Sequence, residues 1–391
     1  MKDVPTRPEP NVTVIRLNHM RPQVVRVLIA QAAFQPDDWV QDRGLYRLRD
    51  VTVLASWIDR IKNTSREYTV DMVLFPELSI PIDSVPRLQQ WSRETGVTVI
   101  AGSHYHGSGS RTIARCPVII AGEVFFVEKL NPAPIELSPV PGEGLSAGSS
   151  VSVFLGTPVG NLGVLVCSDY LDARLRSEVL ATGVDLLCVP SFQRDSSMYH
   201  QRMHIDCEEH HEGLYITYAN SFCDGVGDGM SACFGVVDHM FLEKLQSAHL
   251  TDGSPPTKAC SLAQNEEGIV VDLDMTAKRP TVPRTIRTHP NVTVVASIRS
   301  TDVRSGAFAA AVAHDDERYR NIERLFVPPA EFGVIREKLE SNHIVFIVGD
   351  PGIGKTYTAA MLLKLYYDKG YRPTWFTGLE REERLMQRQV L

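Results

Sequence analysis

The sequence predicts an α/β fold for most of its 391 residues, followed by the opening segment of a nucleotide-binding domain. Three observations predict this. From residue 24 onward, short apolar segments alternate with segments whose apolar residues recur at helical spacing. Several of the apolar segments end in a residue with a reactive side chain. Near the C-terminus, an apolar segment leads directly into a glycine-rich loop and then into a helical pattern.

Strands and helices are expected to alternate along residues 24–222. Residues 24–34 form a continuous apolar segment typical of a buried strand, and residues 42–62 predict a helix because their apolar residues recur every three or four positions. The other expected elements are strands at 71–77 and 96–105, a helix near 84–95, two adjacent strands around Ala121-Gly122, a strand at 162–170, a helix at 172–182, a strand at 185–192, a helix at 196–212 and a strand at 215–222. Such alternation predicts a layered α/β architecture.

Composition excludes several classes of protein. Apolar residues make up 43% and charged residues 22%, as in a globular protein with a sizeable core. The net charge of −7 gives no electrostatic reason to bind nucleic acid or an anionic membrane. No apolar segment is long enough to span a membrane and the N-terminus lacks a secretory signal, so we expect a cytoplasmic protein whose seven cysteines are thiols.

Three predicted strand ends carry side chains of complementary chemistry: Glu77 after DMVLFP, Lys129 after VFFVE, and Cys167 after LGVLV. Together they would suit attack on an amide or nitrile carbon. A thiolate is the nucleophile, and a nearby lysine cation should lower the pKa of the thiol. A glutamate in apolar surroundings can exchange protons, and the ammonium can stabilise the oxyanion. Because all three lie at strand ends, we expect their loss to affect chemistry more than folding.

These segments resemble the nitrilase superfamily of carbon–nitrogen hydrolases over residues 24–298. Phe75-Pro76-Glu77 resembles the general-base segment of that family, Lys129 resembles its lysine, and the segment from Gly163 to Asp169 resembles its nucleophile elbow. The strands 185–190 and 218–221 are similar to those that follow the nucleophile. The resemblance implies a four-layer αββα sandwich, a small-molecule amide or nitrile substrate, no cofactor for hydrolysis and a homo-oligomer.

Members of that family often have a second glutamate between the lysine and the cysteine. Glu143, in PGEGLSAG, is the better match, and Glu136 is the alternative. Two departures concern the substrate pocket: the interval from Glu77 to Lys129 is shorter than is typical, and Asn131-Pro132 replaces the usual sequence after the lysine. The substrate class therefore stays open.

The predicted helix 196–212 carries several residues that could bind a metal. His200, His204, Cys207 or Glu208, and His211 would share one helical face, and imidazole and thiolate bind zinc. Ligands spread along one straight helix at about 1.5 Å per residue are too far apart to converge on a single ion. We therefore predict no metal.

The second motif lies at residues 349–356. Gly349-Asp350-Pro351-Gly352-Ile353-Gly354-Lys355-Thr356 fits the Walker A pattern, with the apolar segment HIVFIV before it and a helical pattern after it. Backbone N–H groups of the loop would hold phosphates, Lys355 would reach the β- and γ-phosphates, and Thr356 would bind Mg²⁺. The motif predicts ATP binding with Mg²⁺.

Residues 326–391 resemble the start of STAND-type signalling NTPases. The expected organisation is a leader at 1–23, the nitrilase-like domain at 24–298, a connector at 299–328 and an incomplete P-loop domain at 329–391. No apolar strand ending in Asp or Glu follows Thr356, so the Walker B carboxylate is missing. We expect a fragment or a truncated product that binds nucleotide weakly and does not hydrolyse it.

Two functions follow from these patterns. The first is a Cys-dependent hydrolase of a non-peptide C–N bond, controlled by a nucleotide switch and plausible in antiviral defence. The alternative is a catalytically silent sensor that binds a small nitrogenous metabolite and signals to the NTPase. The complete set of Glu77, Lys129 and Cys167 favours the enzyme, because a sensor needs no nucleophile with its base and cation.

Overall fold

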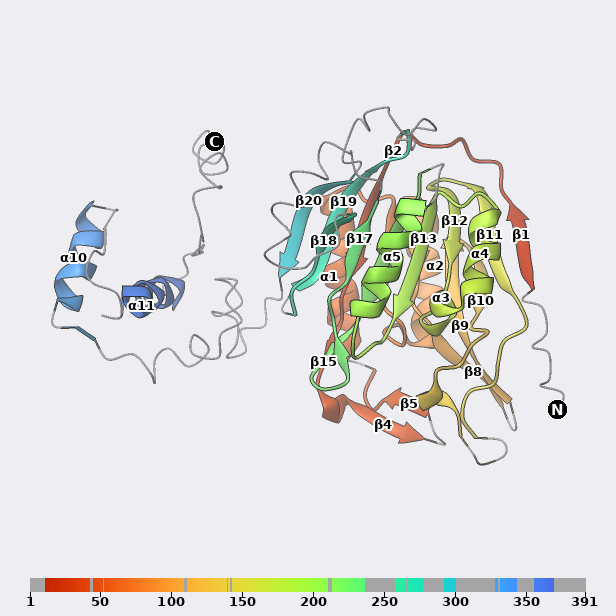
Figure 1. Cartoon of the computed structure of the whole chain (residues 1–391), viewed down its shortest axis with the longest axis horizontal. Helices are drawn as coiled ribbons and strands as arrows, with labels where there is room; N and C mark the ends of the chain where they lie inside the picture. The colour runs from red at the N-terminus through yellow and green to blue at the C-terminus, as the bar shows by residue number, and fades with distance from the viewer. Residues whose placement is uncertain are drawn as a thin grey trace. The chain divides into compact units, whose positions relative to one another are not determined.

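The structure is a computed structural model of the whole chain (Figure 1). It describes residues 11–299, except 43–44, 52, 109–110, 139, 141–142, 210–212, 236–256, 265 and 277–291, and beyond them residues 328–342 without 330, and 355–368. The chain divides into two compact units, Met1–Arg299 and Ser300–Leu391, which are described separately. Among the described residues, no helix is long and apolar enough to cross a membrane.

Two large mixed β-sheets make up the first unit. The seven-stranded sheet has the order β1 (Val12–Arg16), β11 (Val151–Thr157), β12 (Gly160–Val164), β13 (Leu186–Ser191), β14 (Tyr215–Asn220), β17 (Ala232–Phe234) and β18 (Lys258–Ser261). The eight-stranded sheet has the order β10 (Glu123–Glu128), β9 (Arg111–Ile120), β7 (Thr98–Ile100), β6 (Met72–Leu74), β2 (Val24–Ala30), β19 (Glu266–Asp274) and β20 (Val292–Arg299), with β8 (His104–Ser108) paired to β9.

The two sheets pack face to face, and helices cover their outer faces. Alternate residues of β2 show this, because Val27 and Ile29 lie in the core shared by both sheets, whereas Leu28 packs with the helices on the other side. Those helices are α1 (Val53–Glu67) and α2 (Val85–Thr95). Figure 1 shows α4 (Ala173–Ala181) and α5 (Ser197–Glu209) covering the seven-stranded sheet. The four-layer αββα sandwich is confirmed.

Parallel pairing brings the chemically interesting strand ends to one end of the sandwich. β6 runs parallel to β2 and β7, and β12 runs parallel to β13, which runs parallel to β14. The carboxyl ends of parallel neighbours meet at the same edge of a sheet. The segments after β6, β12, β13 and β14 therefore lie where side chains from both sheets can meet.

Two segments differ from the expectation. Residues 45–48 belong to a hairpin of β4 (Trp39–Asp42) and β5 (Leu45–Leu48), and the helix begins only at Val53. Leu45 and Leu48 fit the helical spacing by chance, whereas the partner strand β4 decides the backbone. Within the expected leader, β1 adds a parallel edge strand to β11, which the four consecutive β-branched residues of VTVIR favour.

The remaining described elements are small. β3 (Ala33–Phe34), β15 (Phe222–Cys223) and β16 (Gly227–Asp228) form a three-stranded sheet, and the short helices are η1 (Pro36–Asp38), η2 (Ile82–Ser84), η3 (Pro134–Glu136) and α3 (Ser168–Leu171). In the second unit, the described elements are α10 (Phe332–Asn342) and α11 (Lys355–Asp368). The expected strand HIVFIV and the loop from Gly349 to Gly354 lie outside the described residues.

Candidate active site

Glu77 is held in the interior directly after β6. Its side chain is 3% exposed, and its backbone N–H donates to the Ser191 carbonyl of the opposite sheet at 3.3 Å. The segment before it approaches its neighbour so closely that a Cβ on Gly102 would lie 2.0 Å from the Pro76 carbonyl oxygen. Only glycine fits at residue 102, which also has a φ of +63°. Close packing therefore fixes the glutamate.

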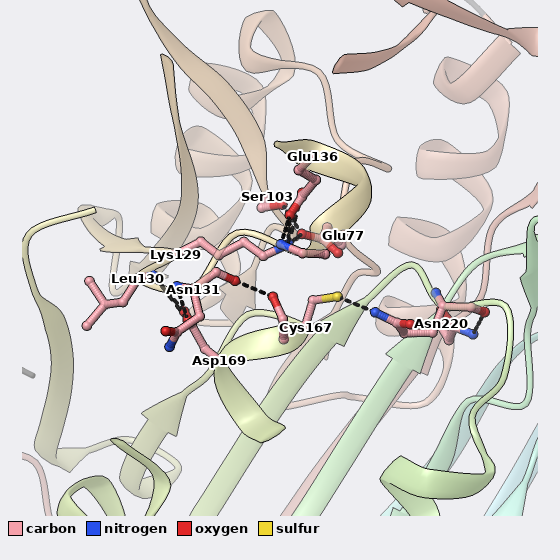
Figure 2. Close-up of polar contacts among 12 residues, drawn as sticks. Glu77, Ser103, Lys129, Leu130, Asn131, Glu136, Cys167, Asp169 and Asn220 are labelled. Atoms are coloured by element: carbon pink, nitrogen blue, oxygen red, sulfur yellow. Dashed lines mark hydrogen bonds and ion pairs between the residues drawn. The ribbon is translucent and has the colours of Figure 1, made fainter. Parts of the chain in front are cut away.

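Lys129 follows β10 and is almost completely buried, with 1% of its side chain exposed. Its ammonium donates to Glu77 Oε1 at 2.9 Å and to both carboxylate oxygens of Glu136, at 2.9 and 2.7 Å. Figure 2 shows the three side chains converging beside Cys167. One buried cation thus lies between two buried carboxylates.

Of the two candidates for the second glutamate, the structure brings Glu136 to Lys129, whereas Glu143, the one preferred from the sequence, lies away from it. Glu136 ends the short helix η3, which turns the chain back toward Lys129, and its Oε2 also accepts from the Ala133 N–H at 2.6 Å. Glu143 follows a separate turn, is exposed, and its carboxylate accepts from Ser138 Oγ at 3.4 Å. The sequence match to PGEG did not reveal which of the two turns faces the lysine.

The ion cluster shifts the pKa values of its members. Burial alone would lower the pKa of Lys129, but the charges of Cys167, Glu77 and Glu136 raise it well above its usual range. Burial raises the pKa of Glu136, with Lys129 opposing the shift and Glu77 adding to it. The ammonium therefore stays charged, and Glu136 takes up a proton more readily than an ordinary carboxylate does.

Cys167 lies at a sharp bend between β12 and α3. Its φ of +53° is unusual for a residue other than glycine, and its N–H donates to the Pro190 carbonyl at 2.9 Å. The thiol is 2% exposed, and Gln193 Nε2 donates to its sulfur at 2.7 Å. The expected strand-to-helix elbow is present, and the strained residue is the one that carries the thiol.

The pKa of the Cys167 thiol is raised to about 12, opposite to the expected direction. Burial raises it most, Glu77 and Glu136 raise it further, and Lys129 and the Gln193 hydrogen bond lower it only in part. The charge of Lys129 is already matched by two carboxylates, so little is left to stabilise a thiolate. The resting side chain is a thiol, and a base must remove its proton.

Gln193 and Asn220 form the wall beside the sulfur. Asn220 is completely buried and accepts from the Gln193 N–H at 2.7 Å, while its own Nδ2 donates to the Gln193 carbonyl at 3.0 Å and to Asp228 Oδ1 at 2.7 Å. These bonds fix the backbone from which the Gln193 side chain reaches Cys167. Asn220 lies within the segment 218–221 that resembles the family, whereas nothing in the sequence indicates Gln193.

Asp169 connects the nucleophile bend to the segment after Lys129. Its buried carboxylate accepts from the backbone N–H groups of Leu130 and Asn131 at 2.7 to 3.1 Å, and Ser168 Oγ donates to the Asn131 carbonyl (Figure 2). Burial raises the pKa of Asp169 to about 7, although these hydrogen bonds and Lys129 lower it. The hydrogen bonds of Asp169 and Ser168 therefore hold the segment after Lys129 against the segment after Cys167.

The histidines of α5 point to separate partners. The ring of His200 donates to the Met230 carbonyl at 3.1 Å, His204 Nδ1 lies 2.8 Å from Thr257 Oγ1, and Cys207 donates to the Leu214 carbonyl at 3.6 Å. His211 lies outside the described residues. Among the side chains that the structure describes, no three His, Cys, Asp or Glu residues are grouped as metal ligands would be.

Alkylation by iodoacetamide should modify Cys167 and accelerate about tenfold per pH unit from pH 7 to 10, because the pKa near 12 keeps the thiolate fraction proportional to hydroxide in that range. The half-buried Cys260 is the competing thiol, so a Cys260→Ala protein should be used and the labelled peptide identified by mass. Cys167→Ala is the control. A rate that levels off near pH 8, or preferential labelling of Cys188 or Cys207, would contradict the assignment.

Comparison with known proteins gives two kinds of similarity. Residues 326–390 match the model of the family described as Novel STAND NTPase 3. A cysteine-to-alanine mutant of the Nesterenkonia AN1 amidase, from the nitrilase superfamily, is 18% identical with a TM-score of 0.49 over 64% of this chain and 90% of that chain. A further structure of an amidase from Nesterenkonia sp. is 19% identical with a TM-score of 0.49 over 67% and 95%. The comparison with curated proteins gave no match.

The match at residues 326–390 is to a STAND NTPase, the type of protein that the C-terminal segment resembles. The Walker A residues from Gly349 to Thr356 fall within the matched range 326–390, although the loop itself lies outside the described residues and only the helix that begins at Lys355 is described.

Proposed function

We propose that the first unit is a Cys-dependent hydrolase of a non-peptide C–N bond, of the amide, nitrile or N-carbamoyl type. The observation that carries the proposal is the buried Lys129 ammonium, held between Glu77 and Glu136 beside Cys167. Burying three charged groups costs several kcal/mol each, and a buried ion cluster next to a thiol is typical of a reaction centre rather than of a structural core.

In the first step, Glu77 acts as the general base. The thiol has a pKa near 12, so its proton moves to the Glu77 carboxylate as Sγ forms a bond to the carbonyl carbon of the substrate. The carbonyl π electrons move to oxygen and give a tetrahedral oxyanion. A base is needed because the thiolate is scarce at neutral pH.

Lys129 stabilises that oxyanion. Its ammonium keeps its proton in the site, and the backbone N–H of Ser168, directly after the nucleophile, can add a second donor. Donors fixed in position before the reaction stabilise developing charge without reorganising. Glu136 and Glu77 hold the ammonium so that it need not move.

The intermediate breaks down when protonated Glu77 gives its proton to the leaving nitrogen. The C–N bond then breaks, ammonia or an amine leaves, and a thioester to Cys167 remains. Water then attacks the thioester while Glu77 accepts a proton from it, and the C–S bond breaks as the acid forms. Glu77 returns this proton to the sulfur, so that the thiol and the carboxylate are both restored.

We further propose that residues 349–356 bind a nucleoside triphosphate and that this binding controls the hydrolase, in a signalling or defence protein. The support is the glycine-rich pattern, the start of α11 at Lys355 and the match to Novel STAND NTPase 3. Bound Mg²⁺ would neutralise phosphate charge, with Thr356 as its ligand.

Ammonia release from a panel of amides, nitriles and N-carbamoyl compounds tests both proposals when it is measured with and without ATP and Mg²⁺. We expect turnover that is lost in Cys167→Ala, and a nucleotide effect that is lost in Lys355→Ala. Binding of a panel compound without any turnover would instead support the silent sensor. Turnover that persists in Cys167→Ala would refute the mechanism.

A further inference from the structure

The hairpin of β4 and β5 is anchored next to the candidate active site. Leu45, the first residue of β5, is buried in a small apolar cluster with Ala114 and Leu145. Both neighbours are one hydrogen bond from the ion cluster, because the Lys129 N–H donates to the Ala114 carbonyl at 3.0 Å and the Leu145 N–H donates to the Glu136 carbonyl at 2.7 Å. In Figure 1 this hairpin lies at the end of the sandwich where α3 begins.

Arg47 lies on the same side of β5 as Leu45, because residues two apart in a strand face the same way. Its guanidinium is 5.6 Å from the ring centroid of Tyr105, in a cation–π contact. Its ion pair, with Asp42 at 3.5 Å, joins side chains that are 47% and 56% exposed. Such exposed pairs are weak, so the guanidinium keeps most of its donor capacity for another anion.

Tyr105 lies beside the strand whose Ala114 carbonyl accepts from the Lys129 N–H. It lies opposite Ala114 in the pairing of β8 with β9, and it belongs to the same apolar cluster as Leu45. Burial raises the pKa of its phenol, and the charges of Glu136 and Glu77 raise it further. The phenol therefore stays a hydrogen-bond donor at neutral pH.

We propose that Arg47 and the Tyr105 hydroxyl form a subsite for a carboxylate of the substrate, so that the hydrolase acts on amides that also carry a carboxylate. The inference rests on the proposed function. A guanidinium can donate two parallel hydrogen bonds to a carboxylate, and a phenol can add a third. The carboxylate binds at the hairpin, and the amide reaches the thiol past Tyr105.

The geometry also gives a reason for a cation at this position. The site holds two carboxylates and one ammonium. An anionic substrate would be repelled by this surplus of negative charge unless a cation met its carboxylate. Arg47 meets that requirement, and its place at the surface lets the carboxylate keep part of its hydration.

The test compares the monoamides of butanedioic, pentanedioic and hexanedioic acid with neutral alkyl amides of matched length. Their Kd values are measured by calorimetry on the full chain carrying Cys167→Ala, so that binding is followed without turnover, and kcat/KM is measured on the parent chain. We expect at least one acid amide to be favoured about tenfold or more over its neutral match. Arg47→Gln should reduce that preference to within about twofold, mainly through KM and Kd.

Arg66→Gln is the matched control, because Arg66 is exposed in the last turn of α1, before β6, whereas Glu77 follows β6. Arg66→Gln should leave the preference for acid amides unchanged, and Arg47→Lys should keep part of that preference. The subsite would be overturned if Arg47→Gln lowered kcat/KM equally for acid and neutral amides, or if the parent chain showed no preference for acid amides. If the parent chain binds acid amides selectively but releases no ammonia, the subsite stands and the hydrolase proposal fails.

Discussion

Lys129→Ala is expected to abolish turnover and also to lower the free energy of unfolding by about 3–5 kcal/mol, which is the usual cost of removing one partner from a buried ion pair. The ammonium is 1% exposed and donates three short hydrogen bonds to two buried carboxylates. Without it, Glu77 and Glu136 face each other with unmatched negative charge. In the folded fraction, the loss of oxyanion stabilisation should lower kcat by about a hundredfold or more.

Urea unfolding at pH 5 and pH 8 would measure this effect and its sign. In the variant, the unmatched carboxylates favour taking up a proton in the folded state, so stability should be regained as the pH falls and be lowest at pH 8. Arg174→Ala on α4 is the control, because its ion pair with Glu178 at 3.3 Å joins two exposed side chains and should contribute less than about 1 kcal/mol. A Lys129→Ala protein as stable as the parent at both pH values would contradict this account.

Glu77→Gln separates chemistry from folding in the same cluster. Glutamine keeps the shape and a hydrogen-bond acceptor for the Lys129 ammonium, but it cannot take the thiol proton. The expectation from the sequence that strand-end residues matter little for stability therefore holds better for this substitution than for Lys129→Ala. Position along a strand did not show that the lysine would be buried between two carboxylates.

The sequence predicted those parts of the site that follow regular elements. Glu77, Lys129 and Cys167 each follow an apolar strand, which strand periodicity predicts. Parallel pairing then brings the ends of β6 and β12 to one end of the sandwich, and the antiparallel hairpin of β9 and β10 carries Lys129. Loops were harder to predict, because no periodicity indicates which of two turns faces inward. Glu143 was preferred over Glu136 for this reason, and Gln193 was missed.

The direction of the Cys167 pKa could not be predicted from residue types alone. A lysine beside a thiol lowers its pKa only when the charge of the lysine is not already neutralised. Here the carboxylates of Glu77 and Glu136 both pair with Lys129, and burial then dominates. The helix predicted at 42–62 begins only at Val53 for a similar reason, since the pairing of β4 with β5 is a contact that local spacing does not contain.

Replacing Glu136 and Glu143 in turn should give opposite results. Glu136→Gln is expected to lower kcat by about two orders of magnitude or more, because the carboxylate accepts two hydrogen bonds from the Lys129 ammonium and one from the Ala133 N–H. With glutamine the ammonium keeps only Glu77 as a charged partner and loses the position from which it stabilises the oxyanion. Glu143→Gln should leave kcat within about twofold, because this side chain is exposed and contacts Ser138.

The pair is a matched test, because both substitutions remove one charge and keep nearly the same volume. Steady-state ammonia release gives kcat, and the pH dependence of Cys167 alkylation adds a readout that a purely structural role would not move. Glu136 raises the pKa of the thiol directly, so Glu136→Gln should speed alkylation at a given pH even as turnover falls. Slower turnover together with unchanged alkylation would reduce Glu136 to a packing role, and a large kcat loss in Glu143→Gln would restore the glutamate that the sequence favoured.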